Sequence, residues 1–267
     1  MKTTTSQPRD FLGLQLLDMP YFRAVLRAVE CRFYQDYDLP GPVLDLGCGD
    51  GHFVTVAFDH PLDVGIDPWT APVREAGKRG GYRLAVQGYG DRLPFEDGYF
   101  ASAISNSVLE HIPDVDSVVC EISRVLKPGS IFLFCVPNRN FLANLSVSSF
   151  FDRLGLRPVG DAYRAFFNRI SRHKHCDSPE VWEARLKTAG FTVEKWWHYF
   201  SPHALHILEW GHYFGLPSWI THTIFGRWNL TRSGWNLALT RSIVQPAYDE
   251  LPYQPKGSYT FYVAKKI

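Results

Sequence analysis

The feature that most constrains this chain is a glycine-rich turn between a short apolar strand and a helix. The predicted strand is Val43–Leu46, and three glycines at alternate positions follow it before an apolar run that begins at His52. Glycine permits the positive φ angles of a tight turn and lets a ligand touch the main chain. A helix that begins directly after such a turn points free N–H groups and its positive dipole end at whatever lies there. The segment therefore predicts a cradle for a nucleotide-type cofactor.

The pattern of the turn separates the cofactor classes only in part. A dinucleotide fingerprint has the form G-x-G-x-x-G, and here the third glycine comes one position early, with His52 where a glycine is needed. A phosphate-binding P-loop needs a lysine near its end, and none is present. Asp45, before the turn, would repel a pyrophosphate but could accept hydrogen bonds from turn amides or an ammonium group. The remaining pattern, D-x-G-x-G-x-G, suits a zwitterionic amino-acid moiety.

A second acidic residue ends the next predicted strand. The apolar run Leu62–Ile66 is followed by Asp67, about 20 residues after the glycines. At this spacing a carboxylate can accept hydrogen bonds from both hydroxyls of a ribose. Asp67 with Pro68 could instead form only a turn before the helix predicted over residues 70–79. Because NAD-binding folds share this acid, it predicts an adenosine-type cofactor without choosing one.

Three further segments follow in order: LPFEDGYF at residues 93–100, ISNSVLEHI at 104–112 and RVLKPGS at 124–130. With the turn and Asp67, they resemble the class I S-adenosylmethionine-dependent methyltransferases, especially the small-molecule methyltransferases. The resemblance is close over residues 40–137 and covers the rest in outline. It implies S-adenosyl-L-methionine as cofactor and a Rossmann-like α/β fold. The implied sheet has seven mostly parallel strands in the order 3-2-1-4-5-7-6, with strand 7 antiparallel and helices on both faces.

The resemblance also implies where the cofactor binds. Where the family has Gly-Asp-Ala before Leu-Pro-Phe, this chain has Gly88-Tyr89-Gly90, and the acid Asp91 comes two places later. Adenine would then be held by backbone groups and by the Tyr89 ring. The expected contacts are Asp45, Gly47, Cys48, Gly49 and Gly51 at the methionine end, Asp67 at the ribose, Tyr89, Gly90 and Asp91 at the adenine, and Asn106 and Ser107 toward the sulfur.

Histidines are the candidates for chemistry. Methyl transfer is an in-line displacement, so the protein positions the nucleophile and removes its proton where needed. His111 follows the predicted fourth strand and titrates near neutrality, which makes it the candidate base or substrate contact; a structural role for Glu110-His111 is the alternative. Alternation puts His173 and His175 on one side of an extended segment, but no second ligand pair has a recognisable spacing, so no metal site is predicted. With Arg172, they suit a phosphate or carboxylate at the rim of the site.

The chain is expected to form one methyltransferase domain over residues 1–267, with two insertions. The first insertion stands where similar methyltransferases have a helical lid over the substrate; a helical pair that only thickens the domain is the alternative. Residues 1–10 are polar and are expected to be disordered. The predicted parts are a cofactor-binding core at 20–137, a helical lid at 138–178, sheet elements at 179–199 and 258–267, and an aromatic-rich insertion at 200–257.

The aromatic-rich insertion holds four of the eight tryptophans and a single acid between Ser201 and Gln245. Such a segment can line a hydrophobic pocket, form a dimer face or make a peripheral contact with a membrane interface. Together the two insertions point to a bulky apolar small-molecule acceptor, such as a lipid or prenyl-type metabolite. The acceptor atom can be oxygen, nitrogen or carbon.

Composition restricts partners and location. A net charge of +1 gives no electrostatic case for nucleic acid. Five cysteines in no paired spacing argue against a disulfide framework, and no signal peptide or membrane span is recognisable. The expected location is cytoplasmic, with or without peripheral membrane contact.

Two alternative functions remain. One is a dinucleotide oxidoreductase, which His52 and the later motifs disfavour. The other is a non-catalytic relative that binds the cofactor or a partner protein.

Overall fold

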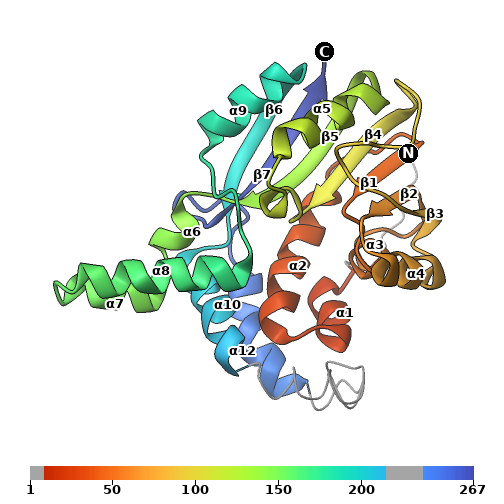
Figure 1. Cartoon of the computed structure of the whole chain (residues 1–267). Helices are drawn as coiled ribbons and strands as arrows, with labels where there is room; N and C mark the ends of the chain where they lie inside the picture. The colour runs from red at the N-terminus through yellow and green to blue at the C-terminus, as the bar shows by residue number, and fades with distance from the viewer. Residues whose placement is uncertain (1–8, 215–236) are drawn as a thin grey trace.

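The computed structural model describes residues 9–214 and 237–267, which form a seven-stranded sheet with helices around it (Figure 1). The strand order is β3-β2-β1-β4-β5-β7-β6, and β7 runs antiparallel to both of its neighbours while the other pairs are parallel. This confirms the order and directions implied by the sequence. The strands are β1 (Val43–Leu46), β2 (Leu62–Asp67), β3 (Tyr82–Gln87), β4 (Phe100–Asn106), β5 (Leu126–Pro137), β6 (Phe191–Tyr199) and β7 (Tyr259–Lys266).

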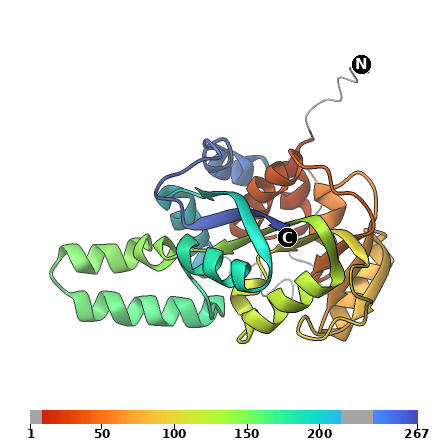
Figure 2. The same ribbon diagram turned by 90° about the horizontal axis from the view of Figure 1, so that it is seen from above.

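Two hydrophobic layers lie on the two faces of the sheet (Figures 1 and 2). Successive residues of a strand point to opposite faces, so Leu133 and Cys135 of β5 belong to one layer and Phe132 and Phe134 to the other. This explains why β5 is apolar without alternation: both of its faces are covered. One layer is covered by α1 (Phe11–Asp18), α2 (Tyr21–Tyr34), α3 (His52–Ala57), α4 (Thr70–Arg79), α10 (Pro202–Phe214) and α12 (Ala238–Tyr248), and the other by α5 (Val115–Val125) and α9 (Pro179–Thr188).

The beginning of the described chain is ordered. The Asp10 side chain accepts a hydrogen bond from the Gly13 N–H and so caps α1, and it forms an ion pair with Arg241 of α12 at 2.5 Å. Arg9 donates to the Thr55 carbonyl at 2.9 Å. The expectation of disorder is therefore wrong for residues 9 and 10, because two distant helices, α3 and α12, supply their partners. Residues 1–8 lie outside the described part.

The first insertion folds as a helical hairpin that projects away from the sheet in both views (Figures 1 and 2). It consists of α6 (Asn140–Ala143), α7 (Ser146–Arg153) and α8 (Arg157–Ser171). In the second insertion, α10 and α12 pack on α2. Three of its tryptophans, Trp219, Trp228 and Trp235, lie outside the described residues. No helix within residues 9–214 and 237–267 is long and apolar enough to cross a membrane.

Candidate functional site

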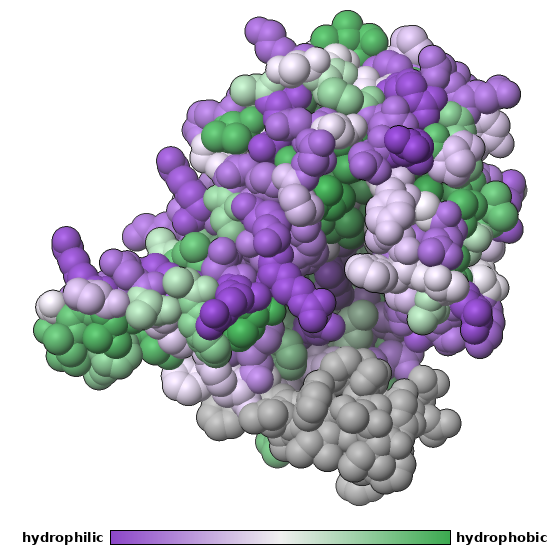
Figure 3. Space-filling model, in the orientation of Figure 1, coloured by the Kyte–Doolittle hydropathy of each residue, from purple (hydrophilic) through white to green (hydrophobic). Residues whose placement is uncertain are grey.

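A cavity of 1510 Å³ opens at the carboxyl ends of β1, β2 and β4. Its walls come from α2, the turn after β1, residues 88–91, the short helix η1 (Leu109–His111) and the end of α8. The hollow is visible near the centre of Figure 3. In open α/β sheets, ligands bind at this edge. Small-molecule sites usually measure about 300–1,000 Å³, so this cavity has room for a cofactor and a second ligand.

The glycine-rich turn is held by the end of β2. The backbone N–H groups of Gly47 and Cys48 both donate to the Ile66 carbonyl, at 2.8 and 3.0 Å. Gly47 has a φ of 80°, and a Cβ there would lie 2.4 Å from the Val108 methyl groups, so only glycine fits. Of the turn residues expected at the methionine end, Gly47 is in the cavity wall, whereas Cys48, Gly49 and Gly51 are not.

Asp67 joins the turn to the cavity. Its Oδ2 accepts a hydrogen bond from the Gly49 N–H at 3.1 Å, and its Oδ1 accepts from the Trp69 N–H at 3.0 Å. The side chain is almost fully buried, yet it lines the cavity. Each carboxylate oxygen can accept two hydrogen bonds, so one acceptor position on each oxygen is left for a ligand. This geometry suits the two hydroxyls of a ribose.

Asp45 lies behind the turn and not in the cavity wall. It is buried and accepts a hydrogen bond from the Tyr82 hydroxyl at 2.5 Å. Burial raises the pKa of Asp45 to about 7. The suggestion that its carboxylate accepts from the turn amides is wrong, because those of Gly47 and Cys48 bond to β2 and that of Gly49 bonds to Asp67. Its contact with the cofactor stays a prediction.

The three residues expected at the adenine share one wall of the cavity. Tyr89, Gly90 and Asp91 all line it, and the Tyr89 ring is exposed. A Cβ on Gly90 would lie 3.1 Å from Val118, so the segment runs close against α5. The backbone and the ring are therefore available to a planar ligand, as the sequence suggested.

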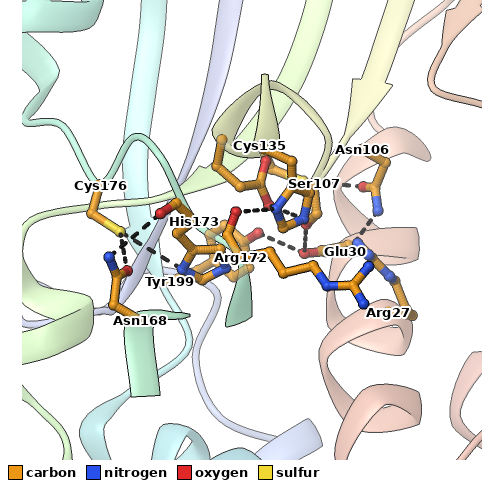
Figure 4. A network of polar contacts seen from close by, with 12 residues as sticks. Arg27, Glu30, Asn106, Ser107, Cys135, Asn168, Arg172, His173, Cys176 and Tyr199 are labelled. Atoms are coloured by element: carbon orange, nitrogen blue, oxygen red, sulfur yellow. Dashed lines mark hydrogen bonds and ion pairs between the residues drawn. The ribbon is translucent and has the colours of Figure 1, made fainter. Parts of the chain in front are cut away.

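A buried polar network holds the ends of β4 and β6 against α2 (Figure 4). The Glu30 carboxylate, fully buried, accepts from Arg27 and from the Asn106 amide, both at 2.7 Å. It also accepts from the Ser107 hydroxyl at 3.1 Å and from the Tyr199 hydroxyl at 2.9 Å. Ser107 lines the cavity, but Asn106 does not. The Asn106 side chain thus bonds to Glu30 and supports the site without lining the cavity. Its expected contact toward the sulfur stays a prediction.

Sequence reasoning missed Glu30, although a signal was present. Leu26 and Phe33, four residues before and three after it, are buried, so Glu30 lies on the apolar face of α2. A carboxylate at such a position must find partners, because a buried charge is otherwise very costly. The partners come from strands far along the chain.

His111 is oriented by the segment that follows α8. Its Nδ1 lies 3.1 Å from the Arg172 carbonyl oxygen. Because a carbonyl only accepts, Nδ1 carries the proton and Nε2 of the neutral ring can accept one; Nε2 lies 3.8 Å from Glu110 Oε1. Burial lowers the pKa of His111 below its usual value, so the ring is neutral at pH 7. His111 lines the cavity, which is the position that a general base requires.

Two further groups meet His111. Glu110 is buried, its Oε2 has no hydrogen-bond partner, and burial raises its pKa to about 8. The His173 ring lies 5.4 Å from that of His111, and burial lowers its pKa to about 3. The donor atoms of all three lie within 4.8 Å of one another, an arrangement that can hold a metal ion. Arg23 and Arg172 line the same end of the cavity and disfavour a cation there.

The two histidines of the extended segment, His173 and His175, have different surroundings in the structure. His173 lines the cavity, whereas Nε2 of His175 lies 3.0 Å from the Ile112 carbonyl oxygen and its Nδ1 lies 3.4 Å from Asp177. The prediction that both lie on one side is wrong, because the backbone N–H groups of Lys174 and His175 both bond to the Glu110 carbonyl and bend the segment around η1.

The sheet order and a cavity at its carboxyl edge define a Rossmann-like protein that binds an adenosine-type ligand. Residues 44–134 match the family described as "Methyltransferase domain". This match and the fold support the resemblance of the chain to the class I S-adenosylmethionine-dependent methyltransferases. The family match decides against the dinucleotide oxidoreductase.

Three known proteins illustrate the similarity. A sterol 4-C-methyltransferase of Caenorhabditis elegans is 32% identical over 123 residues, covering 40% of this chain and 35% of the relative. A ubiquinone biosynthesis O-methyltransferase of Hahella chejuensis is 38% identical over 110 residues, covering 38% and 46%. The structure of geranyl diphosphate C-methyltransferase from Streptomyces coelicolor matches with a TM-score of 0.57 at 15% identity, covering 93% of this chain and 84% of that one. The matches to the curated relatives span between about a third and a half of their length.

Proposed function

We propose that this chain transfers the methyl group of S-adenosyl-L-methionine to a small acceptor with a bulky apolar part. The observation that carries the proposal is the juxtaposition, in one cavity, of Asp67 at one end and His111 at the other. The first offers free acceptor positions for a ribose, and the second offers an unprotonated ring nitrogen. In-line methyl transfer needs the cofactor's sulfur and the nucleophile of the acceptor on opposite sides of the reacting carbon, so cofactor and acceptor must share one cavity.

The cofactor would occupy the half of the cavity nearest β1 and β2. Asp67 would accept from its ribose hydroxyls, and the wall formed by residues 88–91 would flank its adenine. When bound, the cofactor supplies an electrophilic methyl group. The positive charge that drives the reaction is the cofactor's own, so the protein's contribution is placement and proton removal. Ser107, fixed by Glu30, lies in the wall between the two halves.

The acceptor would occupy the other half, between α2 and the first insertion. Apolar side chains line this part, and they come from the three helices α2, α6 and α10: Phe22, Leu26, Phe141 and Leu208. Their presence supports a bulky apolar acceptor, and the names of the three similar proteins (sterol, ubiquinone and geranyl diphosphate) agree with it. The lid role of the first insertion, a peripheral membrane contact of the second insertion and a cytoplasmic location belong to the same proposal.

His111 is the residue whose replacement tests the chemistry. For an oxygen or nitrogen acceptor, Nε2 takes the proton that the acceptor loses, and a general base contributes about 10²–10⁴-fold. We expect His111→Asn to lower kcat by about this factor while S-adenosylhomocysteine binds as before. Because the pKa of His111 is lowered, the acidic limb of the wild-type rate, where the ring protonates, should lie at a lower pH than for an unperturbed histidine. The variant should lack this acidic limb.

The assay is incubation of a cell extract with methyl-labelled cofactor, followed by mass spectrometry of the labelled product. His175→Asn serves as the matched control, because His175 itself does not line the cavity. Full activity of His111→Asn at every pH would leave His111 a structural role. Cofactor binding with no labelled product from any extract would identify a non-catalytic relative.

A further inference from the structure

The acceptor half of the cavity carries positive charge that the protein does not neutralise. Arg23, Arg172 and Lys174 all line it, and within residues 9–214 and 237–267 none of them has an acidic partner. Arg27, one helical turn after Arg23 on the same face of α2, is by contrast paired with Glu30 at 2.7 Å. Unpaired guanidinium groups that line one cavity mark a place where an anion is expected.

The backbone fixes where this charge lies. Arg172 ends α8 with a φ of 59°, and its carbonyl oxygen is the acceptor for Nδ1 of His111. The Arg172 side chain therefore starts beside the proposed base. Arg23 approaches from α2, on the other side of the cavity. One acid of this end, Glu110, is buried behind His111, and its backbone carbonyl holds Lys174 in place.

We infer that the acceptor is an amphiphile whose anionic head, a phosphate or a carboxylate, binds between Arg23 and Arg172 while its apolar part lies on Phe22 and Phe141. This inference rests on the proposed function and adds the charge of the substrate to it. A planar guanidinium group suits both head groups, because it donates two parallel hydrogen bonds to either of them.

The test compares probes that share an octyl chain: octyl phosphate, octanoate and octanol. Binding to the full-length protein saturated with S-adenosylhomocysteine is measured by calorimetry. We expect at least one anionic probe to bind about tenfold or more tightly than octanol, and the stronger of the two to identify the head group. Arg23→Gln with Arg172→Gln should remove this preference and leave the affinity for S-adenosylhomocysteine unchanged.

The control is Arg157→Gln, at the far end of the hairpin. Equal binding of octanol and both anions, or an unchanged preference in the double variant, would overturn the inference. Loss of S-adenosylhomocysteine binding by the wild-type protein would instead overturn the proposed function, so the two failures are distinguishable.

A second, independent observation concerns the tip of the α7–α8 hairpin, defined here as residues 150–159. Its apolar side chains Phe150, Leu154, Leu156 and Val159 are between 44% and 58% exposed. They form the hydrophobic patch at the lower left of Figure 3, at the end of the hairpin that projects furthest from the sheet in Figure 1. Apolar side chains gathered at such an exposed end mark an interaction surface.

The charge of the hairpin indicates what covers this tip. Residues 146–172 contain five arginines and two aspartates. Both aspartates, Asp152 and Asp161, are paired with Arg164. Arg153 and Arg157 lie within the tip, between its apolar residues, and have no such partner among the described residues. Apolar residues flanked by unpaired arginines are typical of segments that insert into an anionic lipid interface.

We propose that the hairpin tip docks on an anionic membrane surface. The other end of α8 reaches the cavity at Arg169 and Arg172, so the hairpin connects a lipid surface to the acceptor site. This differs from the contact expected of the tryptophan-rich insertion, because the patch lies on another part of the chain.

Vesicle flotation of the full chain tests it. We expect binding to phosphatidylcholine vesicles that contain about 30% phosphatidylglycerol, and little to phosphatidylcholine alone. Phe150→Ser, Leu154→Ser and Leu156→Ser together should reduce binding about tenfold or more, since each removes buried apolar area at the interface. The matched control replaces Leu84 and Val181 by Ser, since these are similarly exposed on β3 and α9.

No binding by the wild-type protein, or an equal loss in the control, would overturn the proposal. A dimer in solution that the tip variant abolishes would also overturn it, because the patch would then be occupied by a second copy of the chain.

Discussion

Asp67→Ala is expected to weaken S-adenosyl-L-methionine binding about 100-fold or more. Hydrogen bonds to a charged group contribute about 1.5–3 kcal/mol each, and the substitution removes two of them from the ribose. Each 1.4 kcal/mol corresponds to a factor of about ten in the dissociation constant. The same carboxylate also accepts from the Gly49 and Trp69 N–H groups, so the shape of the turn is loosened at the same time. Calorimetric titration with the cofactor measures the effect.

Two variants separate these contributions. Asp67→Asn keeps the shape but presents an amide N–H₂ group to one of the two backbone donors, so it should bind the cofactor weakly while remaining folded. Asp116→Ala, on α5 at the exposed surface, should leave binding unchanged. A folded Asp67→Ala protein with wild-type affinity would contradict the assignment of this carboxylate to the ribose.

Glu30→Ala is expected to destabilise the fold by about 3–5 kcal/mol, the usual cost of removing one partner from a buried ion pair. The substitution leaves four donors without their acceptor: the Arg27 guanidinium, the Asn106 amide, and the Ser107 and Tyr199 hydroxyls. Since domains of this size are stable by about 5–15 kcal/mol, the loss is a large fraction of the total. Urea unfolding followed by circular dichroism gives the free energy of unfolding.

Two smaller changes, one inside the network and one outside it, give the scale for this loss of stability. Tyr199→Phe removes one donor to the carboxylate and should cost about 1.5–3 kcal/mol. Glu75→Ala, at an exposed pair with Lys78, should change stability by less than about 0.5 kcal/mol. If Glu30→Ala cost no more than Tyr199→Phe, the four donors would have other acceptors and the network would not be what fixes Ser107.

Much of the fold could be predicted because its signals are local. The turn after Leu46, the helix after Gly51 and the strand ending at Asp67 follow from residue types within a few positions of one another. A parallel sheet then brings the ends of β1, β2 and β4 to one edge, so Asp67 and His111 meet in one cavity as expected. The suggested bonds from the turn amides to Asp45 were wrong, because Tyr82 of β3 donates to this carboxylate; the contact of Asp45 with the cofactor stays a prediction.

The sequence by itself determined the strands and the glycine-rich turn of the cofactor-binding part, since these depend on apolar periodicity and on glycine geometry at short range, and its resemblance to a known family implied the strand order. Only the tertiary structure decided which side chains support the site. Glu30 and Tyr199 lie 169 residues apart, yet they share one hydrogen bond. The unpaired arginines of the cavity and the exposed tip of the hairpin were likewise decided by the tertiary structure. Distant segments that fold against a residue decide whether a charge is paired and whether an apolar side chain is covered. The local sequence does not show which segments these are.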